Sequence, residues 1–249
     1  MAEVVIVVPC FNEATRLDTA AFRDYAPKRH RVRVLFVNDG SGDETAQVLD
    51  SLCATAPERF RAIHLPSNLG KGEAVRSGLL AALREQPAYV GYWDADLATP
   101  LDAIEELCDV LCARPKVEMV FGARVKLLGR TIERSRARHY AGRVFATAAA
   151  NVLRLAVYDT QCGAKLLRVT PGLPALLDEP FLARWIFDVE LIARLIRARS
   201  GTDATPVAEA IYEYPLLTWN GLNTGRLHLR DYPIAALALA RIYWRYLRT

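Results

Sequence analysis

The chain has 249 residues, of which 52% are hydrophobic and 24% charged, and its formal net charge is +4. This length fits one large domain or two small ones, and the apolar content excludes a disordered chain. The mild positive charge permits an anionic substrate or a membrane surface and does not indicate a nucleic-acid partner. No stretch reaches the roughly 18 apolar residues of a membrane span, so we expect a cytoplasmic protein whose membrane contact is at most peripheral, on the inner face.

The first half of the chain alternates between strand-like and helix-like patterns. Short β-branched runs predict strands, and the stretches between them predict helices. The expected strands are 4–8, 33–37, 62–65, 89–93 and 117–122, and the expected helices are 43–54, 72–83 and 101–112. This order predicts an α/β fold with a mostly parallel, doubly wound sheet and flanking helices.

The second half is richer in helical patterns and contains no repeat or linker that would divide the chain. Helices are expected at 132–157, 188–198 and 233–246, and extended segments at 164–169 and 210–214. We therefore expect residues 1–249 to form a single domain. The segments 125–157 and 228–249 mix arginines with apolar and aromatic residues, which suits either a membrane surface or packing on the sheet or on a second subunit.

Basic residues recur at every fourth position near the start of the first of these two segments. They are Lys126, Arg130, Arg134 and Arg138. This spacing places them on one side of a helix if that helix begins early enough. Such a row fits contact with an anionic partner, or a solvent-exposed basic face.

The cysteine count is odd, and no two cysteines form a Cys-x-x-Cys pair. They are Cys10, Cys53, Cys108, Cys112 and Cys162. We expect buried, free thiols in a reducing compartment.

Asp94 and Asp96 follow the expected strand 89–93 in the order Asp-Ala-Asp. Residues i and i+2 of an extended chain point the same way, so both carboxylates are directed at one spot beyond the carboxyl end of the strand. Open parallel sheets bind their ligands at that edge. A divalent cation relieves the repulsion between the two carboxylates, and hard oxygen ligands suit Mg²⁺ or Mn²⁺. The alternative is an acidic loop that turns into the next helix.

Other polar loops are expected at the same edge. Pro9–Glu13 follows the first strand, and Asn38–Ser41 follows the second. Asp39 suits a hydrogen-bond acceptor for a ribose or a base edge, or an Asx-turn that caps the next helix. The segment Asn68–Gly72 lacks the spacing of a P-loop, but a glycine loop at a helix N-terminus suits an anion, and Lys71 adds positive charge.

Candidate polar groups also lie in the second half. Gln161, in the segment Asp159–Gly163, offers a neutral oxygen that could complete a metal shell, or it is an ordinary loop amide. Asp188 and Glu190 begin an expected helix, where acidic residues also complement the helix dipole.

Taken together, these segments resemble family 2 glycosyltransferases. In chain order the matching segments are Val-Pro-Cys-Phe-Asn-Glu, Val-Asn-Asp-Gly-Ser, Asn-Leu-Gly-Lys-Gly, Asp-Ala-Asp, Gly-Ala-Arg, Asp-Thr-Gln-Cys-Gly-Ala-Lys and Phe-Asp-Val-Glu-Leu. The most similar subgroup is that of the dolichyl-phosphate glucosyl- and mannosyltransferases. The resemblance implies the GT-A fold, an α/β domain that binds a nucleotide sugar.

The resemblance also implies roles for individual residues. The residues expected to bind the donor are Pro9, Asn12, Glu13, Asp39 and Asp94. Lys71 is added to them because its glycine loop at a helix N-terminus suits an anion. The metal set is Asp94, Asp96 and Gln161. The acceptor-phosphate set is Arg124, Arg134 and Arg138, and the catalytic pair is Asp188 and Arg124.

The expected reaction is an inverting transfer of a hexose from UDP-glucose or GDP-mannose to a polyprenyl phosphate, with Mg²⁺ or Mn²⁺ at the leaving diphosphate. An ionised acceptor phosphate needs arginines to position it more than it needs a base, whereas a hydroxyl acceptor would make Asp188 the base. The segment 218–226 reads Thr-Trp-Asn-Gly-Leu-Asn-Thr-Gly-Arg in place of the family's Trp followed by Gly-Ser-Lys. The alternatives are therefore transfer to a soluble or glycan hydroxyl, or nucleotide-sugar binding without turnover. The sequence is also compatible with an oligomer.

Overall fold

The computed structural model describes residues 1–133, 136–221 and 231–248. Its strands are β1 (Glu3–Cys10), β2 (Arg31–Asn38), β3 (Phe60–His64), β4 (Tyr89–Trp93), β5 (Met119–Ala123), β6 (Thr131–Glu133), β7 (Ala164–Arg168), β8 (Ile211–Pro215) and β9 (Thr218–Asn220). Its helices are α1 (Thr19–Asp24), α2 (Thr45–Thr55), α3 (Lys71–Leu83), α4 (Ala103–Ala113), α5 (Arg136–Leu153), α6 (Leu173–Leu177), α7 (Phe187–Arg199), α8 (Val207–Ala210), α9 (Asp231–Ile242) and the π-helical turn η1 (Tyr243–Leu247).

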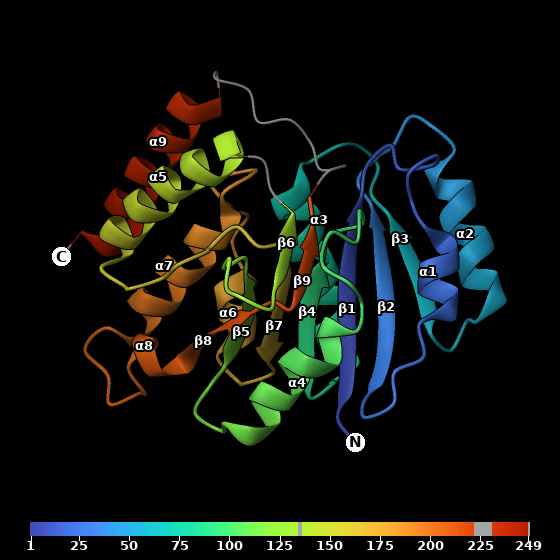
Figure 1. The fold of residues 1–249 in the computed structure, drawn as a ribbon, viewed down its shortest axis with the longest axis horizontal. Helices are drawn as coiled ribbons and strands as arrows, with labels where there is room; N and C mark the ends of the chain where they lie inside the picture. The colour runs from blue at the N-terminus through green and yellow to red at the C-terminus, as the bar shows by residue number, and fades with distance from the viewer. Residues whose placement is uncertain (134–135, 222–230, 249) are drawn as a thin grey trace.

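A seven-stranded sheet in the order β3-β2-β1-β4-β7-β5-β8 forms the centre of the molecule (Figure 1). Its neighbouring strands are parallel except where β7 pairs with β4 and β5. The prediction of an α/β fold with a mostly parallel sheet is therefore confirmed.

Side chains on alternate positions of β1 enter two separate cores, because successive residues of a strand face opposite sides of the sheet. Val4, Ile6 and Val8 belong to a core completed by α1, α2 and α4. Val5 and Val7 belong to a second core completed by α3, α6 and α7. Both faces are thus covered, which explains why the strands read as nearly continuous apolar runs.

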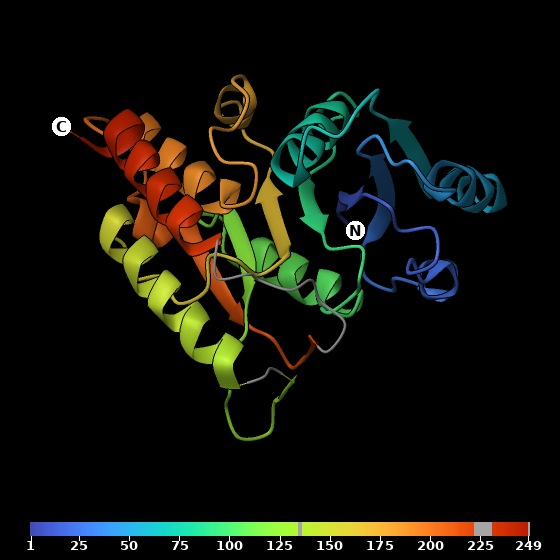
Figure 2. The ribbon, with the colours of Figure 1, turned by 90° about the horizontal axis from the view of Figure 1, so that it is seen from above.

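Helix α5 and the pair α9–η1 pack on α7 and form an outer layer whose buried side chains extend the second core. Figures 1 and 2 show this layer at the end of the molecule opposite α1 and α2. No described helix has the length and apolar content that a membrane span requires.

Strand β7 decides which loops meet at the carboxyl edge of the sheet. It runs antiparallel between β4 and β5, with Trp93 opposite Ala164 and Tyr92 opposite Lys165. The start of β7, and not its end, therefore lies beside the carboxyl end of β4. This reversal brings the loop 159–163 next to Asp94.

The prediction of a helix at 132–157 is wrong for the first residues of that range. Thr131–Glu133 forms β6, which pairs in parallel with β9, and α5 begins at Arg136. Ile132 is buried opposite Trp219, so tertiary pairing outweighs the local helical pattern here.

The expected basic row is also not on one helix. Lys126 and Arg130 lie in the turn region before β6. Arg134 falls outside the described residues, and Arg138 lies on α5 with a side chain outside the described part. The short helices α1, α6 and α8 and the strands β6 and β9 were not expected. The cysteines are free, as predicted, but the prediction that all are buried is wrong, because Cys112 is exposed and Cys53 is half-buried.

Candidate active site

Asp94 follows β4 directly and forms an ion pair with Lys71, with 2.5 Å between Oδ1 and Nζ. Its backbone N–H donates to the carbonyl oxygen of Gly163 at 2.9 Å. Burial lowers the pKa of Lys71, but the charges of Asp94 and Asp188 outweigh it and raise that pKa. Three segments therefore meet at one place: the Asp-Ala-Asp turn after β4, the glycine loop 68–72 and the loop 159–163.

Asp96 lies on the same turn with an exposed side chain, and its Oδ1 accepts the N–H of Ala98 at 3.0 Å. Desolvation and the negative charge of Asp94 raise the pKa of Asp96. The turn thus leaves a second carboxylate facing solvent beside the first.

The loop after β1 and the loop after β2 are joined by hydrogen bonds. Asn12 has a positive φ of 52°, donates its N–H to Ser41 Oγ at 2.9 Å and accepts the N–H of Gly42 at 3.0 Å. Glu13 donates its N–H to Thr45 Oγ1 at 2.8 Å. Pro9 lies just before them, within β1 and opposite Val37 of β2. The predicted donor residues 9–13 and 38–41 therefore lie side by side.

Asp39 is 2% exposed and holds the glycine loop. Its two carboxylate oxygens accept the N–H groups of Leu69 at 2.8 Å and Gly70 at 2.9 Å. Gly70 has a φ of +96°, which a residue with a side chain rarely adopts. Arg184 lies over Gly70 and donates to Asn68 Oδ1 at 2.7 Å. Asp39 thus sets the position of Lys71 through the backbone.

Arg124 is paired with Asp159 at the end of β5. Its Nε and Nη2 donate to the two carboxylate oxygens at 2.6 and 2.7 Å, and both side chains are nearly buried. The guanidinium carbon lies 5.1 Å from the ring centroid of Trp219. Burial raises the pKa of Asp159, but the charge and hydrogen bonds of Arg124 outweigh it and lower that pKa to about 2. One edge of the predicted phosphate-binding guanidinium is therefore already occupied by a carboxylate.

Asp188 is 5% exposed at the start of α7. Its Oδ1 accepts a hydrogen bond from the hydroxyl of Tyr92 and lies 2.7 Å from Nζ of Lys165. Burial raises the pKa of Asp188 and lowers the pKa of Lys165. The contact between them opposes both shifts, because opposite charges favour each other's ionised form.

Lys165 is the site residue whose role the sequence analysis missed. It is 1% exposed on β7, and the signal was a lysine inside an otherwise apolar strand. Charged side chains are almost never fully buried unless they are paired, so such a lysine predicts a buried partner.

Gln161 lies half-buried on the loop before β7. Its backbone N–H donates to Asp159 at 3.2 Å, and its side-chain Nε2 has no partner among the described residues. Within the described part of the chain, no three His, Cys, Asp or Glu side chains form a metal cluster. Two carboxylates and an amide nevertheless fit a Mg²⁺-like cation, which usually takes one or two carboxylates and completes its shell with water and substrate phosphates.

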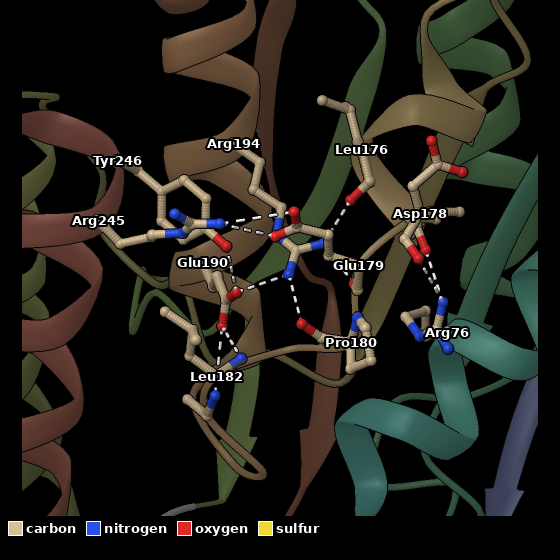
Figure 3. A network of polar contacts seen from close by, with 12 residues as sticks. Arg76, Leu176, Asp178, Glu179, Pro180, Leu182, Glu190, Arg194, Arg245 and Tyr246 are labelled. Atoms are coloured by element: carbon tan, nitrogen blue, oxygen red, sulfur yellow. Dashed lines mark hydrogen bonds and ion pairs between the residues drawn. The ribbon is translucent and has the colours of Figure 1, made fainter.

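Glu190 is fully buried one turn into α7 and joins three parts of the chain (Figure 3). It pairs with Arg194 at 2.7 Å, accepts the hydroxyl of Tyr246 at 3.0 Å, and accepts the N–H of Leu182 at 2.8 Å. Arg194 in turn donates to the carbonyl oxygens of residues 176, 179 and 180. This network fixes the loop that carries Arg184. Glu190 therefore joins α7 to this loop and to η1, in addition to any interaction with the helix dipole.

Of the predicted acceptor arginines, the described residues place only Arg124 near the aspartates. Arg134 and residues 222–226 lie outside them, and so does the side chain of Arg138.

Residues 5–171, more than half of the chain, match the family model described as glycosyl transferase family 2. The chain belongs to glycosyl transferase family 2. The family that the sequence motifs indicated is thereby confirmed.

Several relatives are dolichyl-phosphate β-glucosyltransferases. One from Trichomonas vaginalis is 30% identical over 95% of this chain and 69% of its own length. Those of Saccharomyces cerevisiae and Mus musculus are also 30% identical, over 82% and 76% of this chain. The chain spans 65% and 62% of the lengths of these two relatives.

Solved structures with the same fold belong to other glycosyltransferases. Glucosyl-3-phosphoglycerate synthase from Mycobacterium tuberculosis, in complex with UDP, aligns with a TM-score of 0.67 at 17% identity, covering 98% of this chain and 80% of that one. The same enzyme has been solved with Mn²⁺, UDP and glucosyl-3-phosphoglycerate. S. aureus TarS with UDP aligns with a TM-score of 0.59 at 15% identity, covering all of this chain and 67% of that one. These likenesses confirm the GT-A fold.

Proposed function

We propose that this family 2 glycosyltransferase moves glucose from UDP-glucose to a polyprenyl phosphate, with Mg²⁺ or Mn²⁺, at a membrane surface. The observation that carries the proposal is the meeting of Asp94, Asp96, Lys71 and the loop 159–163 at the carboxyl edge of the sheet. The dolichyl-phosphate β-glucosyltransferases among the relatives support glucose over mannose and a lipid phosphate over a soluble acceptor.

The donor would occupy the edge formed by the loops after β1, β2 and β4. The joined loops around Asn12 and Ser41 offer backbone and hydroxyl groups to the nucleoside. Lys71 begins α3, where the helix N-terminus and its own ammonium suit the diphosphate. Asp39 would act mainly by holding this loop, because both its oxygens already accept backbone N–H groups.

Asp96, Asp94 and the Gln161 amide would hold the cation. A bound Mg²⁺ or Mn²⁺ would neutralise the charge that develops on the departing diphosphate. Lys71 lies 2.5 Å from Asp94 and would share its ammonium between that carboxylate and the donor phosphates. Mn²⁺ and UDP in the glucosyl-3-phosphoglycerate synthase structure support this arrangement.

The acceptor side favours a phosphate over a hydroxyl. A hydroxyl needs a base at the reacting oxygen, but Asp188 is buried and its Oδ1 already contacts Tyr92 and Lys165. A phosphate is ionised near neutral pH and needs only positioning. Arg124 can offer it the guanidinium edge that Asp159 does not take. Arg134 and Arg138 remain further candidates for the same phosphate.

Contact with the membrane would use the exposed apolar face of α9–η1. Ile234, Leu237 and Trp244 are 64%, 55% and 59% exposed, and the exposed Arg241 lies between them along the chain. Apolar and aromatic side chains beside arginines suit a bilayer surface with anionic lipid. The alternative for this face is a second subunit.

The deciding experiment incubates the purified protein and Mn²⁺ with radiolabelled UDP-glucose or GDP-mannose. Each donor is tested with polyprenyl phosphate and with soluble glycan acceptors. We expect label from UDP-glucose in the organic phase, and only with polyprenyl phosphate. Label on the soluble acceptors would support the hydroxyl alternative. Binding of UDP-glucose without transfer to any acceptor would support a non-catalytic binding protein.

A further inference from the structure

Lys165 makes three polar contacts at the centre of the site although it is 1% exposed. Its Nζ donates to the carbonyl oxygens of Thr160 at 2.9 Å and Cys162 at 2.7 Å, and lies 2.7 Å from Asp188 Oδ1. The rings of Tyr92 and Phe121 lie 5.3 and 5.2 Å from the same ammonium. An ammonium has three donors, so these contacts use its full hydrogen-bonding capacity.

The two carbonyl groups belong to the residues on either side of Gln161. Lys165 therefore holds the backbone of the predicted metal-binding amide from both sides. The same loop continues to Gly163, whose carbonyl oxygen accepts the N–H of Asp94 at 2.9 Å. A shift of this ammonium would move both Gln161 and the support of Asp94.

Asp188 connects the same ammonium to the donor loop. The neighbouring Phe187 packs against Gly72, where an added Cβ would lie 3.0 Å from Phe187 Cβ. The Asp188 charge also acts on Lys71 and helps to raise the pKa of its ammonium. The start of α7 thus lies between Lys165 on one side and Gly72, which follows Lys71, on the other.

We propose that Lys165 and Asp188 form a positioning pair that sets the distance between the loop 159–163 and the donor loop 68–72, and that Asp188 acts through Lys165 rather than as a base. This inference rests on the proposed function and assigns two residues within it. The pair is the point at which β4, the start of β7 and the start of α7 are joined.

Stability alone does not account for this pair. A buried ion pair contributes little net stability, and replacing both partners by neutral groups of similar size is often neutral or stabilising, whereas removing one partner is costly. A pair that serves only to stabilise the fold would therefore tolerate joint replacement. A positioning pair would not, because the carbonyl oxygens of Thr160 and Cys162 would lose their donor.

The test compares the wild type with Lys165→Met, Asp188→Asn and the double variant, in which the new amide at position 188 can still accept the Tyr92 hydroxyl. Lys165→Met should lower the Tm by about 10 °C, because Asp188 loses its partner, and the double variant should recover the part of that loss that comes from the unpaired carboxylate. All three variants should lose about 100-fold in kcat, with the KM for UDP-glucose changed by less than about threefold. The double variant should be no worse than either single variant, because both act through one contact.

A second readout does not depend on the acceptor. Amide hydrogen exchange in residues 159–163 should become at least about tenfold faster in the double variant, while exchange in β1 to β3 stays unchanged. Arg33→Met is the matched control, because Arg33 pairs with Glu3 and Glu85 at the far end of the sheet. It should lower the Tm without changing kcat or the exchange of the loop.

Three results would overturn the inference. One is a double variant that recovers both Tm and kcat. Another is unchanged exchange in residues 159–163. The third is an Asp188→Asn variant far less active than Lys165→Met, with a changed pH–rate profile, which would mark Asp188 as a base. A wild type that transfers no glucose would instead refute the proposed function, and the exchange experiment would still decide the role of the pair.

Discussion

The carboxylate of Asp94 lies against the α-carbon of Gly163. A Cβ at position 163 would be 1.9 Å from Asp94 Oδ2 and 2.1 Å from its Cγ, closer than real atoms approach. The loop before β7 can therefore support the Asp-Ala-Asp turn only with glycine at this position. This contact joins two segments that are about 70 residues apart in the sequence.

Gly163→Ala should displace Asp94 and reduce transfer strongly. We expect a loss of about 100-fold in kcat, because misplacement by about 1 Å costs that much, and about 1–3 kcal/mol of stability from overpacking. Steady-state kinetics and urea unfolding measure the two effects. Gly172→Ala is the control, since nothing lies within 4 Å of the added Cβ. Equal activity of the two variants would contradict the contact.

Asp96→Ala should abolish metal-assisted transfer without unfolding the protein. The side chain is exposed and its Oδ1 accepts the N–H of Ala98 within its own turn, so the Tm without ligand should change little. We expect transfer to fall at least about 1000-fold, since a metal supplies several kcal/mol to the transition state. The stabilisation of the protein by UDP with Mn²⁺ should also disappear in a thermal-shift assay.

The control for this variant is Asp102→Ala. Asp102 precedes α4 without forming a side-chain cap, so its loss should leave both readouts intact. An Asp96→Ala variant that retains transfer would remove Asp96 from the metal site.

Arg194→Met should destabilise the protein by about 3–5 kcal/mol, because it leaves the buried Glu190 without its charge partner. Arg245→Ala should cost far less stability, because its pair with Glu179 is exposed and screened by solvent. Urea unfolding of both variants measures the difference. Similar losses in the two would show that burial of the Glu190 pair does not set its contribution.

Thiol labelling of the native protein should separate the cysteines by burial. Cys112 is exposed, whereas burial raises the pKa of Cys10 and Cys108 well above its ordinary value. Because the thiolate is the reactive form, a disulfide reagent at about pH 8 should modify Cys112 first and reach Cys10 and Cys108 only after unfolding. Peptide mass spectrometry identifies the sites. Rapid native labelling of Cys10 would contradict the packing of β1.

Ile234→Asp combined with Leu237→Asp should weaken binding to anionic vesicles by at least about tenfold, since each apolar side chain contributes about 1.5–3 kcal/mol when buried. Co-sedimentation measures the binding. Gln47→Asp with Ser51→Asp is the control for added charge, on α2 at the opposite end of the molecule (Figure 1). If the α9 variant binds vesicles normally but changes the oligomeric state, the face belongs to a subunit contact.

Much of the first half could be predicted from the sequence. The strand 89–93 is predicted with both its ends, and β1 to β3 lie within two residues of their expected positions. These strands are buried on both faces, so their apolar, β-branched runs stand out from the polar loops. The second half was less predictable, because β6 depends on pairing with β9, more than 80 residues later.

The candidate site shows the same division. Asp94, Asp96 and Asp39 could be placed at one edge because polar residues that follow strands of a parallel sheet lie there, and Lys71 could be proposed from the glycine loop at a helix N-terminus. Lys165 was missed because its partner, Asp188, lies on a different element, and strand patterns say nothing of which charge a buried lysine meets.

The sequence by itself determined the α/β class, the family and the set of acidic and glycine loops, because these depend on local patterns and short motifs. The tertiary structure alone decided that β7 runs against its neighbours, which places Gly163 of the loop 159–163 beside Asp94. It also decided that Arg124 and Asp188 are neutralised by Asp159 and Lys165. Strand direction and charge pairing depend on contacts between distant segments. Such contacts produce no periodic pattern of apolar and polar residues in the sequence.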